Sequence, residues 1–325
     1  PIAVHHKSLN PLEGFGVLTA EDTEQFVVEM VGDRNKDLHS RRDLDFSFAL
    51  EHVSRYRVNA HYQREEIALA LRPITEDIPN LAALNLPETI QKFTDLPRGL
   101  VLVTGPTGSG KSTTLASMVE KMNLTQKRHI ITLEDPIEYQ FVSKQSLIEQ
   151  REVGFDVHSF ASGLKFALRQ APDVILLGEM RDLETTSAAL SAAETGHLVL
   201  ATLHTQSAAQ TIERIVDIYP GEQQQYVLSM LANALRAVVS QALLPRVGGG
   251  MVPAVEIMLC TAAVRNCIRE NRIHEIANVI ETSRAEGMCT LDDSLRGLVL
   301  NGLADPKNAL SKSNNPEKLA RDLGL

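Results

Sequence analysis

A glycine-rich stretch at residues 105–112 has the residue types and the spacing of a phosphate-binding loop. An apolar run precedes it and a helix-forming stretch follows it. Glycines let successive backbone N–H groups point into one concavity that holds a polyphosphate, and the following helix adds its unpaired N–H groups. The lysine is a mobile cation for the β- and γ-phosphates, and the serine hydroxyl is a ligand for Mg²⁺. The sequence therefore predicts ATP or GTP binding by Gly105, Thr107, Gly108, Ser109, Gly110, Lys111, Ser112 and Thr113.

Two acidic residues that end apolar runs are candidates for the hydrolysis of a bound nucleotide. Glu179 follows the run Val174–Leu177, where a carboxylate lies beside the phosphate loop and can reach Mg²⁺. The metal-binding acid more commonly sits one residue earlier, where this chain has Gly178. Glu134 ends a second apolar run, which Pro136 stops, and we expect Glu134 to activate the attacking water. The alternatives are a helix-capping acid for Glu179 and a solvated turn for Glu134.

Histidines and arginines outside the glycine-rich stretch are further candidates. His197 and His204 flank an apolar run. A histidine at such a position can hydrogen-bond a γ-phosphate, although a lone histidine is more often a core or loop residue. Arg57 and Arg72 lie on expected strands of the N-terminal part. They are either solvated surface residues or arginine fingers that reach phosphate oxygens from a neighbouring domain or subunit.

Length and composition fit a globular protein of two domains. The chain has 325 residues, of which 43% are hydrophobic and 22% charged. A net charge of −9 and the absence of tryptophan argue against a non-specific nucleic-acid binder. No uninterrupted apolar run reaches the roughly 18 residues of a membrane span, and no secretory signal opens the chain. Three scattered cysteines exclude a disulfide framework and fit a reducing, cytoplasmic compartment.

The pattern of expected elements divides the chain into a small α+β domain at 1–76, a proline-rich linker with a short helix at 77–97, and an α/β domain at 98–325. In the larger domain, short apolar strands alternate with helices, which predicts a mostly parallel sheet covered on both faces. Ligands of such sheets lie at the carboxyl ends of the strands. Farther on, we expect a long amphipathic helix at 223–239, a hairpin at 242–257 and a more helical C-terminal part.

Four stretches together resemble the secretion-superfamily ATPases, and among them most closely the type IV pilus retraction ATPases. They are the glycine-rich loop, Glu-Asp-Pro-Ile-Glu at 134–138, Gly-Glu-Met-Arg-Asp at 178–182, and Ala-Glu-Thr-Gly-His at 193–197 with Leu-His-Thr at 203–205. The segment at 263–270 also resembles an element of the retraction ATPases, for which the family implies a role in retraction beyond ATP hydrolysis.

The resemblance implies a PAS-like first domain, a RecA-like ATPase domain and a ring of six subunits with the nucleotide between the two domains. It implies that Arg57 and Arg72 approach the phosphates, and that ATP and Mg²⁺ are bound. It further implies a place at the cytoplasmic face of the inner membrane, reached through partners only. These partners are a pilus platform protein in that membrane and a possible paralogous pilus ATPase, with no nucleic acid. The family's first helix carries an Asp-Leu-His segment that does not open this chain, so we expect a shortened N-terminal domain.

Three alternatives to a retraction motor stay open at this point. The first is an accessory pilus ATPase of the same family, which binds ATP and helps another motor. The second is an ATPase that assembles a secretion system, although these relatives usually carry a four-cysteine insert that the three scattered cysteines cannot supply. The third is a nucleic-acid motor of the RecA type, which the acidic balance disfavours.

Overall fold

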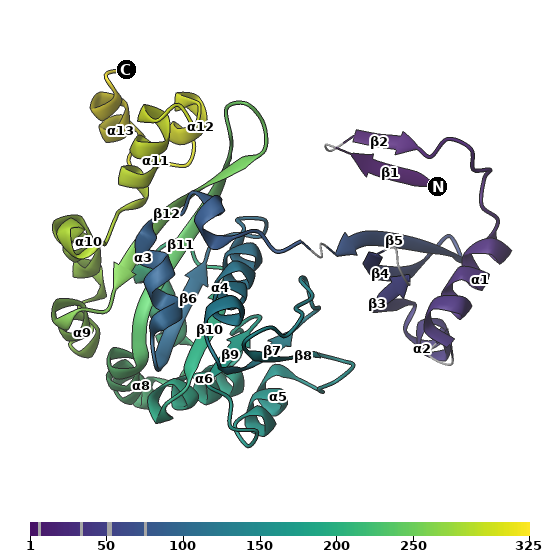
Figure 1. Cartoon of the computed structure of the whole chain (residues 1–325), viewed down its shortest axis with the longest axis horizontal. Coiled ribbons are helices and arrows are strands. Elements are labelled where there is room, and N and C mark those ends of the chain that lie inside the picture. Colours follow the sequence, from purple (N-terminus) through teal and green to yellow (C-terminus); the bar gives the residue numbers. More distant parts are fainter. Residues whose placement is uncertain (6–7, 33–34, 51–53, 75–76) are drawn as a thin grey trace. The chain divides into compact units, whose positions relative to one another are not determined.

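The protein consists of two compact units, Pro1–Glu76 and Asp77–Leu325, in a computed structural model (Figure 1). The structure describes residues 1–5, 8–32, 35–50, 54–74 and 77–325. The first unit has one hydrophobic core, and the second has three clusters of buried apolar side chains. Within the described ranges, no helix has both the length and the apolar character needed to cross a bilayer.

The first unit is built on a three-stranded antiparallel sheet with the strand order β3-β4-β5. Buried residues alternate with exposed ones along these strands, and α1 and α2 add Val27 and Leu38 to the core. A capping box between Thr19 and Asp22 starts α1, which confirms the helix start predicted there. The elements are β1 (Ile2–His5), β2 (Ser8–Pro11), α1 (Ala20–Val31), α2 (Asn35–Arg41), β3 (Asp43–Leu50), β4 (Ser54–Gln63) and β5 (Glu66–Ile74).

The second unit contains a seven-stranded sheet with the order β12-β11-β6-β10-β9-β7-β8. Its pairs are parallel except for β11 with β12, which confirms the mostly parallel sheet. The strands are β6 (Gly99–Thr104), β7 (His129–Glu134), β8 (Leu147–Glu152), β9 (Val174–Leu177), β10 (Leu198–Leu203), β11 (Leu235–Pro245) and β12 (Met251–Leu259). The helices are α3 (Glu88–Lys92), α4 (Lys111–Thr125), α5 (Phe160–Ala167), α6 (Leu183–Thr195), α7 (Ala208–Asp217), α8 (Gly221–Ala234), α9 (Ala262–Arg269), α10 (Ile276–Thr282), α11 (Leu291–Leu300), α12 (Pro306–Leu310) and α13 (Pro316–Leu323).

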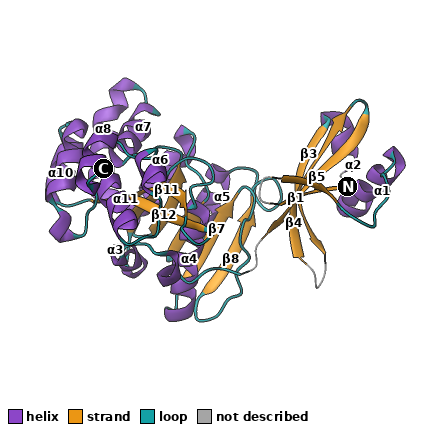
Figure 2. Ribbon diagram, turned by 90° about the horizontal axis from the view of Figure 1, so that it is seen from above, coloured by secondary structure: helices purple, strands orange, loops and turns teal. Residues whose placement is uncertain are grey.

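Helices cover both faces of this sheet, as Figure 2 shows with α6, α7 and α8 on one side and α3 and α4 on the other. The central strand β6 is buried along its whole length. Leu100 and Leu102 contribute to one core, and Val101 and Val103 contribute to the other. A third, smaller core joins α11, α12 and α13 to the end of β11 and the start of β12, next to the hairpin turn.

The expected helix at 223–239 is wrong in its last five residues, 235–239. The helix α8 ends at Ala234, and β11 begins at Leu235 without a connecting loop. The apolar spacing continues across this junction, but Val238 and Val239 are β-branched and pair with β6 and β12. Sheet pairing at the centre of the domain therefore overrides the helical pattern. The hairpin predicted around the three glycines is confirmed, and β8 was not predicted because its sequence is mostly polar.

Residues 77–97 differ from the expected linker because most of them pack into the second unit. Leu81 and Ile90 are buried in the core beneath β6, and Phe93 follows them. Ser117 of α4 donates a hydrogen bond to the Pro79 carbonyl at 2.7 Å. This segment therefore belongs to the second unit, which we expected to begin at 98.

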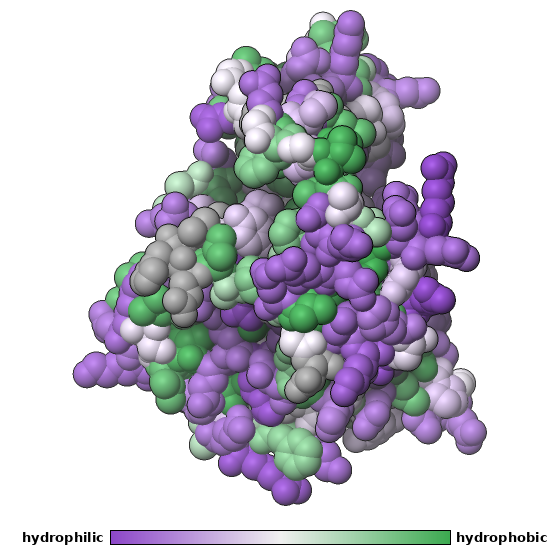
Figure 3. Space-filling view, turned by 90° about the vertical axis from the view of Figure 1, so that its right-hand side faces the viewer, coloured by the Kyte–Doolittle hydropathy of each residue, from purple (hydrophilic) through white to green (hydrophobic). Residues whose placement is uncertain are grey.

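The surface shown in Figure 3 carries hydrophobic residues in small groups between hydrophilic ones. The exposed apolar side chains of the described residues include Leu124 and Tyr226 on helices of the second unit. Single exposed residues of this kind are normal for globular proteins and need no partner.

We predict that Leu102→Ala lowers the free energy of unfolding by about 2–5 kcal/mol, because it leaves a cavity in the fully buried central strand. Urea unfolding followed by far-ultraviolet circular dichroism measures this loss. The control is Leu124→Ala at a side chain that is 47% exposed, with an expected loss within about 0.5 kcal/mol. Equal losses for the two variants would contradict the assignment of β6 to the core.

Candidate nucleotide-binding site

The glycine-rich loop lies where β6 ends, between β11 and β10 at the carboxyl end of the sheet. Two contacts fix this end of the strand. Thr104 Oγ1 donates to Ser240 Oγ at 2.9 Å, and the Gly105 N–H donates to the Leu203 carbonyl at 3.3 Å. The middle of the loop is exposed, and α4 begins directly after it. The strand, loop and helix start thus have the arrangement that phosphate binding requires.

The Lys111 ammonium lies over this loop. Its Nζ donates to the carbonyls of Gly105 and Pro106, at 2.9 and 3.1 Å. Burial lowers the pKa of Lys111, while the nearby carboxylates of Glu179 and Glu138 raise it. The cation is therefore held over the loop and within the field of two acids.

Gly110 gives the loop its last turn before α4. Its φ of 88° lies in the left-handed region, which disfavours any residue with a side chain. A Cβ atom at this position would lie 2.9 Å from Nε2 of Gln241, a buried residue of β11. The same Gln241 accepts a hydrogen bond from Thr114 Oγ1 at 3.0 Å. A neighbouring strand therefore supports both the loop and the first turn of the helix.

The hydroxyl groups of the loop differ in their surroundings. Thr107 is exposed at the tip, and Gly108 follows it. Ser109 is buried, and its Oγ has no hydrogen-bond partner among the described residues. Ser112 and Thr113 are half-buried in the first turn of α4, where Thr113 Oγ1 lies 2.8 Å from the Tyr139 hydroxyl.

Glu179 lies in a cluster at the end of β9. Its Oε1 is 2.6 Å from Arg181 Nε and 3.2 Å from His204 Nε2. Burial raises the pKa of Glu179, but the Arg181 hydrogen bond and the charges of His204 and Arg181 outweigh burial, so the pKa is lowered overall. Glu179 is therefore a carboxylate anion at neutral pH, and the structure brings it to His204 and to the field of Lys111.

Glu134 lies at the end of β7, the strand beside β9. The Gly178 N–H donates to the Leu133 carbonyl at 2.8 Å and thereby aligns the ends of these two strands. Glu134 Oε1 accepts hydrogen bonds from Thr132 Oγ1 at 2.6 Å and from Gln150 Nε2 at 3.2 Å. Burial raises the pKa of Glu134, and these hydrogen bonds counteract part of the increase. The two glutamates thus have pKa values shifted in opposite directions.

The structure places the remaining candidates apart from this cluster. His197 precedes β10 and pairs its carbonyl with the Gly99 N–H at 2.9 Å, at the end of the sheet opposite the loop. Its Nδ1 lies 3.1 Å from the Ala192 carbonyl. His197 therefore lies away from the glycine-rich loop, and its contact with a nucleotide stays a prediction.

Arg57 and Arg72 belong to the first unit, on the neighbouring strands β4 and β5. They are directly opposite each other in the register of the two strands. Like charges in such a pair are destabilising, and neither arginine forms an ion pair with a described residue. An anion that bound both guanidinium groups would relieve this repulsion.

The described residues contain no group of three or more His, Cys, Asp or Glu side chains that could hold a metal ion. Magnesium at a nucleotide site is usually held by one or two protein oxygens together with phosphate oxygens and water. Ser112 Oγ and the Glu179 carboxylate are hard oxygen donors of the kind that Mg²⁺ prefers. The residues around the loop therefore fit a magnesium ion that arrives with a nucleotide.

Sequence reasoning missed three residues that support the site, namely Thr132, Gln150 and Gln241. Each lies on a strand and forms a hydrogen bond within the site. Thr132 and Gln150 bond to Glu134, and Gln241 bonds to Thr114. The only local signal was a polar residue within an otherwise apolar run at Thr132 and at Gln241. The partners of Gln150 and Gln241 depend on which elements are neighbours in the fold, whereas the partner of Thr132 lies on its own strand.

We predict that Gly110→Ala weakens the binding of ADP by about tenfold or more, or about 1.4 kcal/mol, because the methyl group is strained and crowds Gln241. Isothermal titration calorimetry measures the affinity. The control is Gly297→Ala, in a helix with open space around the position, where binding is expected to be unchanged. Unchanged binding by the Gly110→Ala variant would show that this loop does not hold the phosphates.

Comparison with known proteins places this site in a family. Residues 69–284 match the family model of type II/IV secretion system proteins. The chain is 46% identical to the type IV pilus retraction ATPase PilT of Pseudomonas aeruginosa over 315 residues, which is 97% of this chain and 90% of the relative. It is 48% identical to the twitching motility protein of Neisseria gonorrhoeae over 305 residues, covering 93% of this chain and 82% of the relative.

A solved structure is similar over nearly the whole chain. It is a crystal structure of the pilus retraction motor PilT with bound ADP, with a TM-score of 0.92 and 44% identity, covering 99% of this chain and 92% of that one. The chain belongs to the type II/IV secretion system protein family, in the branch of the type IV pilus retraction ATPases.

Proposed function

We propose that this protein is a Mg²⁺-dependent ATPase that works as a ring of six subunits and drives the retraction of a type IV pilus. The observation that carries the proposal is the convergence of the loop, Lys111, Glu179 and His204 at one end of the sheet, with Glu134 on the adjoining strand. Each of these groups has a role in phosphoryl transfer. The similarity to a retraction ATPase over nearly the full chain supports the biological role.

The chemistry that we propose is the transfer of the γ-phosphoryl group to water. The water oxygen bonds to the γ-phosphorus, and the bond from that phosphorus to the β–γ bridging oxygen breaks, which leaves ADP and phosphate. Glu134 takes the proton of the attacking water, a role that its raised pKa supports. Lys111 exchanges the carbonyls of Gly105 and Pro106 for β- and γ-phosphate oxygens.

Glu179 and Ser112 are the residues that we propose to hold Mg²⁺. The lowered pKa of Glu179 keeps its carboxylate ionised, and its Oε1 is already oriented by Arg181 and His204. When bound, the metal neutralises charge that develops on the phosphate oxygens. His204 directly follows β10 and contacts the Glu179 carboxylate. It is therefore suited to transmit the state of the site to α7, the next helix.

The conversion of hydrolysis into motion rests on Arg57 and Arg72 in our proposal. The first unit of the same or a neighbouring subunit would supply these two guanidinium groups to the nucleotide. They would bind its phosphate oxygens and release them when the γ-phosphate leaves. A ring of six could pass this motion to a pilus platform protein in the inner membrane and extract pilin subunits. The protein would then act at the cytoplasmic face of that membrane, held there through partners.

We predict that Glu134→Gln binds ATP with nearly unchanged affinity but loses ATP turnover by about 100-fold or more, because the proton acceptor is gone. Lys111→Ala is expected to lose both binding and turnover, because the phosphates lose their cation. A phosphate-release assay and nucleotide titration measure these effects. The exposed Lys127→Ala is the control, with both quantities unchanged.

The same experiment separates the proposed function from its alternatives. Turnover by the purified hexamer, with loss of pilus retraction in cells that carry Glu134→Gln, is expected of a motor. A protein without turnover of its own, or one whose turnover rises with added DNA, would refute the proposal and favour an accessory subunit or a nucleic-acid motor, respectively.

We predict that Thr132→Val moves the acidic limb of the kcat profile to higher pH. The active form of Glu134 is the carboxylate, so activity falls as the pH drops through its pKa. The Thr132 hydrogen bond lowers this pKa, and its removal raises the pKa further. The control is Thr125→Val at the exposed end of α4, which leaves the profile in place. An unmoved profile for Thr132→Val, with its fold intact by circular dichroism, would rule out Glu134 as the group that sets this limb.

A further inference from the structure

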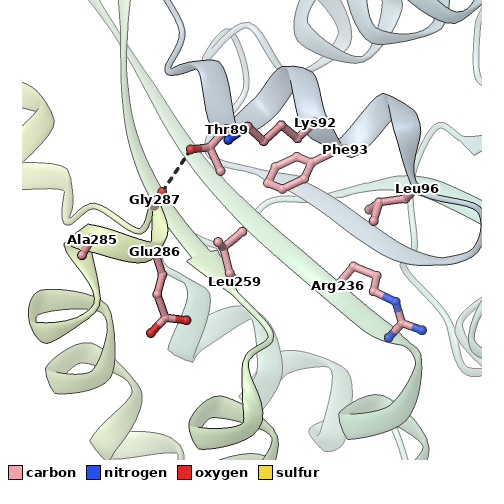
Figure 4. A pocket seen from close by; sticks show the side chains of 9 residues that line it. All are labelled: Thr89, Lys92, Phe93, Leu96, Arg236, Leu259, Ala285, Glu286 and Gly287. Atoms are coloured by element: carbon pink, nitrogen blue, oxygen red, sulfur yellow. Dashed lines mark hydrogen bonds between the residues drawn. The ribbon is translucent and has the colours of Figure 1, made fainter.

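A cavity of about 310 Å³ lies in the second unit, between α3, the start of β11 and the end of β12 (Figure 4). Its apolar part consists of Phe93, Leu96 and Leu259. Lys92 and Arg236 add two cations to its lining. Apolar surface beside positive charge suits a ligand that has an apolar body and an anionic group.

An acidic residue also borders the cavity, so its charge is mixed. Glu286 lies in the turn that ends at Gly287 and lines one side of the cavity. Its side chain is exposed. Figure 4 shows its carboxylate on the side away from Arg236. The Thr89 hydroxyl donates to the Gly287 carbonyl at 3.3 Å and ties this turn to α3. This bond fixes the side of the cavity with Glu286, and Figure 4 shows the Arg236 guanidinium on the opposite side and the Lys92 ammonium extending toward Thr89 in this view.

The cavity is remote from the phosphate loop. Leu235 pairs with Leu100 near the start of β6, whereas Ser240 pairs with Thr104 directly before the loop. At about 3.3 Å per residue, these two positions are roughly 13 Å apart along the sheet. A ligand in the cavity can therefore bind while a nucleotide occupies the loop.

Arg236 is held in a fixed position at this end of the sheet. Its Nη1 donates to the carbonyls of Asn233 and Leu235 at 2.7 and 3.2 Å. Its aliphatic stem lies against Gly99, where a Cβ atom would come within 2.5 Å of Arg236 Cγ. The guanidinium group is thus oriented before any ligand arrives, which lowers the entropy cost of binding.

Arg98 and Arg265 lie near Arg236, and Arg269 binds the side chain of Asn233, whose backbone carbonyl Arg236 binds. We call these four residues the arginine cluster. Burial lowers the pKa of Arg236, and the charges of Arg265 and Arg98 add to this decrease. Arg236, Arg265 and Arg269 all act on the thiol of Cys260, whose pKa burial raises. The cluster therefore extends from the cavity to α9, the helix that contains most of the motif at 263–270.

The arginines of this cluster are not paired with acidic residues in the part of the chain that the structure describes. None of its four members forms an ion pair there, and Arg269 donates only to the side-chain oxygen of Asn233, at 3.1 Å. The adjacent Glu270 and Glu275 are paired with Arg272, each at 2.8 Å. Four cations near one another without a carboxylate repel, and an anionic partner would remove this repulsion.

We propose that the cavity and the arginine cluster form a docking surface for an acidic segment of a partner protein that carries an apolar anchor residue. The cavity takes the apolar side chain against Phe93 and Leu259, and the guanidinium forks bind carboxylates on either side of it. A polypeptide fits because the cluster continues beyond the cavity onto α9, so that several carboxylates can bind at once.

The test measures the binding of a fluorescein-labelled 12-residue peptide made of four Glu-Glu-Leu repeats, by fluorescence anisotropy. Saturating ADP occupies the phosphate loop, so no turnover is involved and a failure of the proposed function does not affect the result. We expect a Kd on the order of 10–100 μM. The Kd is expected to rise with added salt, because salt screens the attraction between the charges. Peptides with Gln in place of Glu, or Ser in place of Leu, are expected to bind about tenfold more weakly or worse.

Variants of the protein locate the binding. Arg236→Gln and the exposed Arg98→Gln are each expected to weaken binding of the Glu-Glu-Leu peptide by about tenfold. The control is Arg321→Gln on α13, which changes the net charge equally and is expected to leave binding unchanged. Circular dichroism confirms that each variant is folded. Equal binding by wild type and both cluster variants would overturn the proposal, as would equal binding of the Gln peptide. Self-association that Arg236→Gln abolishes, without peptide binding by wild type, would instead assign the surface to a second copy of this chain.

Discussion

The nucleotide site depends on the position at which one buried strand ends. β6 is hydrogen-bonded on both sides, to β11 and β10, and is enclosed by a core on each face. Its end cannot shift without breaking both ladders, so the loop and the first turn of α4 are fixed in space. Lys111 is then held over the loop carbonyls and within the field of Glu179. The rest of the site is arranged around this one buried cation.

Glu134 and Glu179 lie in different environments at the ends of neighbouring strands. Glu134 has a pKa raised by burial, and Glu179 has a pKa lowered by Arg181 and His204. Environments that move two carboxyl groups apart in pKa usually divide acid–base work from charge stabilisation. The contrast supports Glu134 as proton acceptor and Glu179 as the residue that faces the metal, a division that the sequence left open.

The two ends of the large sheet have different chemistry. The carboxyl end of the parallel strands carries the loop and both glutamates, together with His204. The opposite end carries Arg236 beside an apolar cavity and, next to it, the start of β6. Since the same rigid strands connect both ends, a partner at the arginine cluster would be held by the element that also fixes the phosphate loop.

The sequence by itself determined the parallel α/β domain, the loop residues and the two glutamates, because these depend on local patterns. An apolar run followed by glycines, or ended by an acid, carries its meaning within a few residues. Only the tertiary structure decided that β11 replaces the last five residues of an expected helix, that residues 77–97 pack into the large unit, and that His197 lies at the far end of β10. It also decided the roles of Gln150 and Gln241, because their partners are set by the order of strands in the sheet, which is a property of long-range pairing and not of any local stretch.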